Sequence, residues 1–370
     1  MSNPPGSWPG NAMPPTQPGP GWHQAPPPGM PVGQYAGRPP QPGPHSPVGW
    51  QQQGAWQQQG AWHQPVPGPP SGGNVQKKIL GILLATCVLA LAGFVALLIL
   101  NRGPDYAHED YEAPPVTENA PDQVQIPATD EEAREILRNN TAYPAVAPDH
   151  VNCEITPMDL DGLDQATLQE RMNDFSACLM RVWDRPLAAQ GLTMFRPSIT
   201  VYASEMSTAC GTIAADEYNA FYCGADQMLY YHLELHRALP TVNTPLGAET
   251  VLSHEFAHFI QGRAGITGAR HRLMATMTDE EILALTRRSE VQADCLAAQW
   301  VRANMTALEV DDGVVAGLIT LIESIGDDPD APEYRNHGAP EIRRAWFEIG
   351  LGTGEVHQCN SWTAPEEQVR

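Results

Sequence analysis

The chain has 370 residues, enough for one to three domains, and carries a formal net charge of −22. All 43 acidic residues lie after position 100, whereas the first 100 residues contain only Arg38, Lys77 and Lys78 as charged groups. An acidic body of this size repels a phosphate backbone, so we expect no nucleic acid among the partners.

The N-terminal segment 1–76 is rich in Pro, Gly, Gln and Trp and shows neither helical nor strand periodicity. So much Pro and Gly cannot assemble a core, and the composition predicts a disordered tail. Because Pro-rich segments favour an extended left-handed helix, an alternative role is to bind a cytoplasmic partner that recognises proline or aromatic side chains.

The next segment is apolar: 79–100, ILGILLATCVLALAGFVALLIL, contains no charge and is long enough to cross about 30 Å of hydrocarbon. A buried core helix would have a polar face, and a cleaved signal peptide would have a shorter apolar run near the N-terminus. Two lysines precede the run and Arg102 alone follows it, which favours a cytoplasmic N-terminus. We therefore predict a transmembrane signal anchor over 77–102 in a single-pass membrane protein, with lipidation at Cys87 as a minor alternative.

The cysteines agree with that orientation, because six of the seven follow the span. An even number in an oxidising, extracytoplasmic compartment suggests up to three disulfides, and spacing alone does not select the pairing. These six residues are Cys153, Cys178, Cys210, Cys223, Cys295 and Cys359.

Residues 103–126 are acidic and proline-bearing, as is typical of a stalk, and we expect the folded domain over 127–370. Periodicity and capping signals predict one sheet-forming region followed mainly by helices, an α+β fold. The expected helices lie over 130–137, 163–183, 248–261, 279–304, 314–325 and 340–349, and the expected strands over 198–203, 220–223 and 228–233.

The strongest chemical signal is VLSHEFAHFIQ, in which His254 and His258 are four residues apart in an apolar helix. Side chains at this spacing share one helix face, and two neutral imidazoles there can hold a zinc ion. Glu255 then lies beside the ion as the general base for a zinc-activated water. The alternative is a pair of core histidines that found hydrogen-bond partners.

A catalytic zinc needs a third protein ligand, and the segment SEVQADC offers Glu290 and Asp294 at helical i, i+4 spacing. We assign Glu290 as the third ligand and Asp294 as the acceptor for the free N–H of a ligating histidine. Reversed roles, or an ion pair with Arg287 or Arg288, are the alternatives.

Several further polar residues are weaker candidates for the site. His232 and His236 are also four apart, but the surrounding segment alternates like a strand, and we expect surface or edge histidines there. His337 is the first candidate to stabilise the oxyanion of peptide hydrolysis, with Tyr230 or Tyr231 next and a loop histidine without a role as the alternative.

Together these segments resemble the bacterial neutral zinc metallopeptidases of the HExxH group, over about 142–362. Departures from the family pattern at Ala257, Phe259, Val291 and Ala298 affect no proposed ligand and concern substrate preference. The resemblance implies a zincin-like fold, one Zn²⁺ per chain, Glu290 as third ligand, and the disulfides Cys210–Cys223 and Cys295–Cys359, which leave Cys153 with Cys178. It rests on STACG with FYC, on HEFAHFIQ, on EVQADCLA, and on a C-terminal segment containing Asn336, His337, Gly338, Arg343, Trp346, Phe347, Gly350 and Cys359.

The predicted function is a membrane-anchored, extracytoplasmic zinc peptidase acting on protein or peptide substrates. One rival is a binding or scaffold protein whose zinc is structural, with His271 or a cysteine as fourth ligand. A second rival is a sensor in which the cytoplasmic tail is the functional element.

Overall fold

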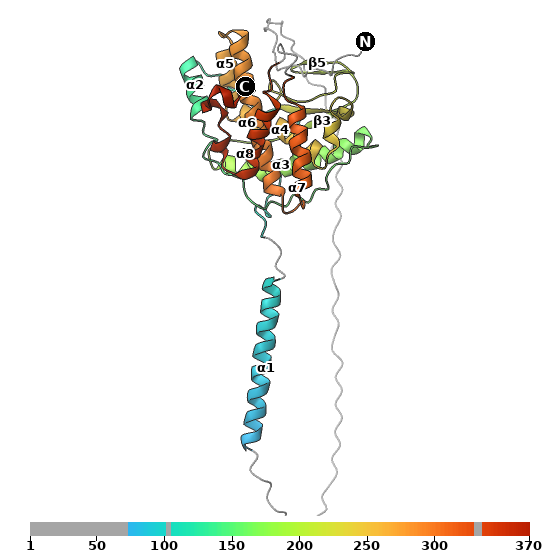
Figure 1. The fold of residues 1–370 in the computed structure, drawn as a ribbon, viewed down its shortest axis with the longest axis vertical. Helices are drawn as coiled ribbons and strands as arrows, with labels where there is room; N and C mark the ends of the chain where they lie inside the picture. The colour runs from blue at the N-terminus through green and yellow to red at the C-terminus, as the bar shows by residue number, and fades with distance from the viewer. Residues whose placement is uncertain (1–72, 101–104, 329–334) are drawn as a thin grey trace, which may run out of the picture. The chain divides into compact units, whose positions relative to one another are not determined.

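The computed structural model describes residues 73–100, 105–328 and 335–370 (Figure 1). Predictions for 1–72 therefore lie outside the described residues. Helix α1 (Gly73–Leu100) includes the last four residues of the predicted tail, 73–76. Its stretch Lys77–Leu98 is long and apolar enough to cross a membrane, by length and composition, and its large apolar side chains are exposed.

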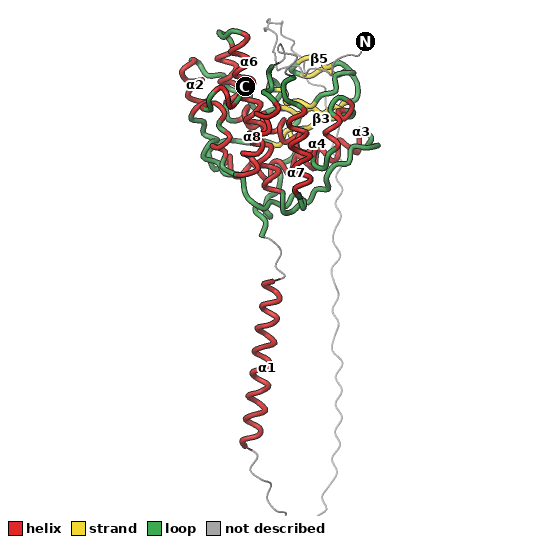
Figure 2. The backbone as a smooth tube through the Cα atoms, viewed as in Figure 1, coloured by secondary structure: helices red, strands yellow, loops and turns green. Residues whose placement is uncertain are grey.

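Residues 105–328 and 335–370 form an α+β domain in which helices predominate over strands (Figure 2). Its main sheet has the strand order β3-β7-β6, with β3 (Ile199–Tyr202) parallel and β6 (Ala220–Cys223) antiparallel to the central β7 (Met228–His232). All five residues of β7 are buried, as expected for a central strand covered on both faces. Two short ladders lie beside it: β1 (Val116–Thr117) with β2 (Arg196–Pro197), and β4 (Met206–Thr208) with β5 (Gly211–Ile213).

Helix α3 (Gln165–Ala188) covers the outer edge of the sheet. The side-chain amides of Gln165 and Gln169 donate to the backbone carbonyls of β3, and Gln169 also accepts from the N–H of Val201. These side chains satisfy polar groups that an edge strand would otherwise leave unpaired. The same edge is therefore closed to further strand pairing.

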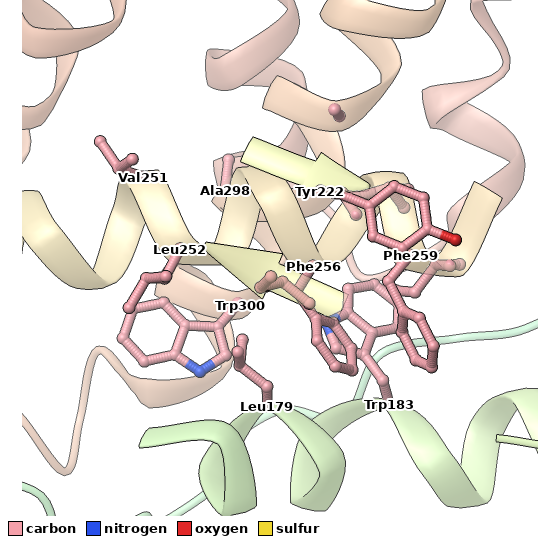
Figure 3. Packing of buried hydrophobic residues seen from close by; sticks show 14 of the residues in the cluster. Leu179, Trp183, Tyr222, Val251, Leu252, Phe256, Phe259, Ala298 and Trp300 are labelled. Carbon is pink, nitrogen blue, oxygen red and sulfur yellow. The ribbon is translucent and has the colours of Figure 1, made fainter. Parts of the chain in front are cut away.

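Helix α4 (Gly247–Arg263) crosses the centre of the domain and is buried almost along its whole length. Figure 3 shows the apolar layer between α4 and α3, where Leu179 and Trp183 of α3 lie against Phe256 and Phe259 of α4. Trp300 joins this layer, and its ring lies edge-on to Phe175 with 4.9 Å between the ring centroids. A helix so enclosed holds its side chains in fixed positions.

Further helices complete the domain. After α2 (Asp130–Arg138) and α5 (Ile266–Met274), which pack together, come α6 (Asp279–Asn304), α7 (Asp312–Ser324) and α8 (Pro340–Gly352). Helix α6 begins with a capping box between Thr278 and Glu281. It packs so closely on α8 that a Cβ built on Gly350 would lie 2.0 Å from the carbonyl oxygen of Cys295.

Three disulfides link the domain: Cys153–Cys178, Cys210–Cys223 and Cys295–Cys359. The last two are the pairings that the family resemblance implies, and the first is the pair that they leave. They suggest an oxidising compartment, and Cys87 in α1 is free.

Two expectations are corrected. The segment expected as a stalk packs on the domain: Arg185 binds Asp110 with 2.7 Å between Nη1 and Oδ1, and β1 pairs with β2. Acidic side chains in this segment form ion pairs with arginines that are distant in sequence. His232 is buried rather than exposed, because the rings of Tyr202 and Tyr218 enclose it edge-on.

Candidate metal centre

Helices α4 and α6 bring three potential metal ligands together. His254 and His258 lie one turn apart on α4, with 3.2 Å between their Nε2 atoms. Glu290 on α6 places Oε2 3.2 Å from His254 Nε2 and Oε1 3.5 Å from His258 Nε2. Ligand atoms of the three residues all lie within 4.8 Å of one another, which is close enough for one ion.

The far side of the His254 ring is held by a buried ion pair. His254 Nδ1 lies 2.9 Å from Asp294 Oδ1, and Arg343 on α8 donates to both oxygens of Asp294 at 2.7 Å. Burial alone would raise the pKa of Asp294, but the charges of Arg343 and His254 hold that pKa below its usual value. Arg343, to which the sequence pattern assigns no role in the site, therefore keeps Asp294 ionised.

The His258 ring is held by an amide network instead. His258 Nδ1 lies 2.9 Å from Gln261 Oε1, while Gln261 Nε2 donates to the Ser289 carbonyl and to Gln292 Oε1. Because two acceptors take the Gln261 amide protons, its oxygen must face His258, and His258 Nδ1 must be the donor. Both glutamines stand inside the quoted motifs, but their roles depend on the packing of α4 on α6.

The donor set fits zinc. With Nδ1 of each ring donating outward, the two Nε2 atoms and the Glu290 carboxylate face one point, where a cation could replace the proton shared by these groups. Burial lowers the pKa of His254, yet its bonds to Asp294 and Glu290 raise that pKa to about 10. The pKa of Glu290 lies well below its usual value because the two imidazoles outweigh the effect of burial. Two nitrogens and one carboxylate oxygen are ligands that zinc prefers.

Glu255 lines the cavity in front of this cluster. Its Oε2 accepts a hydrogen bond of 2.9 Å from the backbone N–H of Tyr222 in β6. Within the described residues its other oxygen, Oε1, makes no hydrogen bond, and burial raises the pKa of the carboxyl group. The sheet edge thus holds one carboxylate oxygen and leaves the second available.

His337 also lines the cavity, from the loop before α8. Two carboxylate contacts position this loop, since the backbone N–H groups of His337 and Gly338 donate to Asp327 at 2.8 and 2.7 Å. Burial lowers the pKa of His337. Tyr230 and Tyr231 do not line the cavity; the Tyr230 hydroxyl binds Asp226 at 2.8 Å.

Arg287, Arg288 and His271 lie in different surroundings. The two arginines do not pair with Glu290 or Asp294, because their guanidinium groups donate to backbone carbonyls of the C-terminal region. His271 is not part of the three-residue cluster. The six cysteines after the span all form disulfides, so none of them is a free thiol that could bind a metal. Within the described residues the cluster therefore offers three protein ligands.

A cavity of about 220 Å³ opens onto the cluster. Its walls come from the start of β6, from α4, α5, α6 and α7, and from the loop before α8. Besides the three potential ligands, Glu255 and His337, the lining residues are Asn219, Ala220, Phe221, Tyr222, Leu239, Val251, Arg270, Met274, Ile282, Leu283, Thr286, Ile322, Ile325, Asn336 and Arg343.

Comparison with known proteins places this domain in a family. Residues 160–362, more than half of the chain, match the model of the family described as "Putative neutral zinc metallopeptidase". The chain is 27% identical to the uncharacterized protein YpfJ of Escherichia coli K12 over 194 residues, which cover 49% of this chain and 66% of that protein. It is 25% identical to the uncharacterized protein Rv2575 of Mycobacterium tuberculosis over 193 residues, 46% of this chain and 64% of that protein.

The matched region thus spans slightly less than two thirds of each relative. No solved structure matches the chain. The family model covers both the histidine-bearing helix α4 and the acid-bearing helix α6. The chain therefore belongs to the putative neutral zinc metallopeptidase family.

Proposed function

We propose that the chain is a zinc-dependent peptidase that hydrolyses peptide bonds in protein or peptide substrates. The observation that carries the proposal is the convergence of His254, His258 and Glu290 at the floor of a cavity that Glu255 also lines. The outward nitrogens of the two histidines are occupied by Asp294 and Gln261, so the ligand atoms are held in place before an ion arrives.

His254, His258 and Glu290 would hold the zinc ion, and Asp294 would orient the first imidazole. When bound, zinc polarises a carbonyl group and lowers the pKa of water at its open position. Glu255 would accept a proton from the attacking water through Oε1 as the water oxygen bonds to the carbonyl carbon. It would pass that proton to the leaving amine as the C–N bond breaks, while the Tyr222 N–H holds Oε2. His337, which also lines the cavity, would donate to the oxyanion.

We also propose a zincin-like fold. Its support is the order of parts: strand β6 lies beside the histidine-bearing helix α4, and the third ligand comes from the later helix α6. The proposed localisation is a cell membrane, with α1 as a single-pass anchor, the N-terminus in the cytoplasm and the domain outside. The lysines before the apolar run and the three disulfides support that orientation.

Metal analysis of the full chain, purified in detergent, tests the proposal. We expect about one zinc per chain in the wild type, as for a site with three protein ligands and an open position. His258→Ala should lose the zinc, and His357→Ala, which changes an exposed histidine near the C-terminus, should keep it. Glu255→Gln should retain zinc and lose hydrolysis of a random peptide pool.

Two results would oppose the proposal separately. Zinc retained by His258→Ala defeats the ligand assignment. Full hydrolysis by zinc-loaded Glu255→Gln defeats the role of Glu255. If neither the wild type nor the variant hydrolyses any peptide, the alternative of a binding or scaffold protein with a structural zinc is favoured.

A further inference from the structure

Arg270 is a buried cation that faces the catalytic cavity. It lies on α5, the short helix that follows the histidine-bearing helix, and only 5% of its surface is exposed. It lines the cavity together with the apolar side chains of Met274, Ile282 and Leu283. Its Nε has no hydrogen-bond partner, and within the described residues the guanidinium group makes no ion pair.

The remaining buried arginines of the described residues have partners. Arg343 binds Asp294 through two hydrogen bonds, and Arg287 donates to the carbonyl oxygen of Arg335. Arg272, two positions along α5, is partly exposed and pairs with Asp130. Among the three buried arginines of the described residues, Arg270 alone makes no hydrogen bond.

A charge buried without a partner destabilises a fold, because desolvation is not compensated by hydrogen bonds. Burial accordingly lowers the pKa of Arg270, and the only opposing charge that raises it is that of Glu290. Glu290 is the proposed zinc ligand, so its charge is shared with the ion when the metal is bound. Unfavourable groups of this kind are retained where a ligand satisfies them.

We propose that Arg270 binds a carboxylate group of the peptide substrate and thereby selects acidic or C-terminal substrate segments. This inference rests on the proposed peptidase function and adds the substrate class. A planar guanidinium group among apolar side chains recognises a carboxylate through two parallel N–H···O bonds. The carboxylate can belong to a free C-terminus or to an Asp or Glu side chain, since both present the same two oxygens.

Peptide binding to the zinc-loaded Glu255→Gln chain in detergent tests the inference without relying on turnover. One probe pair is a random, N-acetylated hexapeptide pool lacking Asp and Glu, with a free C-terminal carboxylate or a C-terminal amide. A second pair is amidated at the C-terminus and contains one Glu or one Gln. Each pair is titrated into the parent, into Arg270→Gln and into the matched control Arg272→Gln, and zinc content is measured in the same samples.

We expect at least one carboxylate-bearing pool to bind the parent about 10- to 100-fold more tightly than its neutral partner, as for a charge-assisted bidentate contact. Arg270→Gln should abolish that difference, and Arg272→Gln should keep it. The first pair assigns the carboxylate to a C-terminus and the second to a side chain. Because Arg270 is unpaired, Arg270→Gln should not lower the melting temperature. A purely structural role of Arg270 would instead predict a lower melting temperature for the variant.

Equal binding of charged and neutral pools by a zinc-loaded parent overturns the inference and leaves the metal site intact. A carboxylate preference that survives in Arg270→Gln overturns it as well. Absence of zinc from the parent instead defeats the proposed function on which the inference rests.

Discussion

Replacing Arg343 by methionine isolates the contribution of the buried ion pair behind the proposed metal centre. Arg343 and Asp294 are 1% and 0% exposed, and two hydrogen bonds of 2.7 Å join them. The substitution leaves Asp294 buried without its cation, a change that destabilises by about 3–5 kcal/mol. For a domain of this size we expect a fall in melting temperature of roughly 6–20 °C. Zinc affinity should also fall, by about 10- to 100-fold, because Asp294 no longer orients His254.

The assay is thermal unfolding of the full chain in detergent, together with zinc titration against a chelator. Arg344→Met is the matched control: Arg344 is the next residue of α8, is half exposed, and pairs with Glu348 on the surface. Such a pair contributes about 0–1 kcal/mol. Adding Asp294→Asn to Arg343→Met should recover part of the stability, since the unpaired charge disappears. A loss for Arg343→Met no larger than that for Arg344→Met would refute the reasoning.

Two further predictions concern stability. Burial raises the pKa of Glu249 from 4.5 to about 7, so the folded state binds the proton more tightly than the unfolded state. The contribution of Glu249 to the free energy of unfolding is therefore largest below pH 4.5. It falls by about 3 kcal/mol in total as the pH rises from 4.5 through about 7. Glu249→Gln, which keeps an acceptor for the Met158 N–H, should remove that fall when urea midpoints of variant and wild type are compared between pH 5 and 8. Cys295→Ser removes a disulfide that closes a loop of 64 residues and should lower the free energy of unfolding by about 4 kcal/mol. Cys210→Ser removes one that closes a loop of 13 residues and should lower it by about 3 kcal/mol. Equal losses of stability in the two variants would contradict the loop-length argument.

The elements that carry the proposed metal ligands could be predicted because their signals are local. Helical spacing and apolar flanks locate the helix around His254 to within two residues at each end. The helical pattern predicted over 279–304 likewise coincides with α6. Sequence patterns do not predict helix α5, because it begins at Ile266 after a turn at Gly265 and has no side-chain cap.

The residues around the ligands could not be predicted in the same way, because their roles depend on tertiary packing. Arg343 reaches Asp294 only because α8 approaches α6 closely at Gly350. Gln261 orients His258 only because α6 supplies acceptors for its amide protons. The composition around Asp110 predicts a stalk, because ion pairs between distant residues leave no periodic pattern. Sequence spacing identifies groups on one helix, whereas these contacts join different helices.

Charge balance in the cavity links the metal centre to substrate choice. A divalent ion at the proposed site would be neutralised by the carboxylates of Glu290 and Glu255, and the charge of Asp294 is matched by Arg343. The charge of Arg270 then remains in a low-dielectric space, where it attracts an anion more strongly than the same group would in water. Removing the metal takes two positive charges away from the cavity and weakens that attraction. Carboxylate binding should therefore require the loaded site, which couples substrate selection to metal occupancy through electrostatics alone.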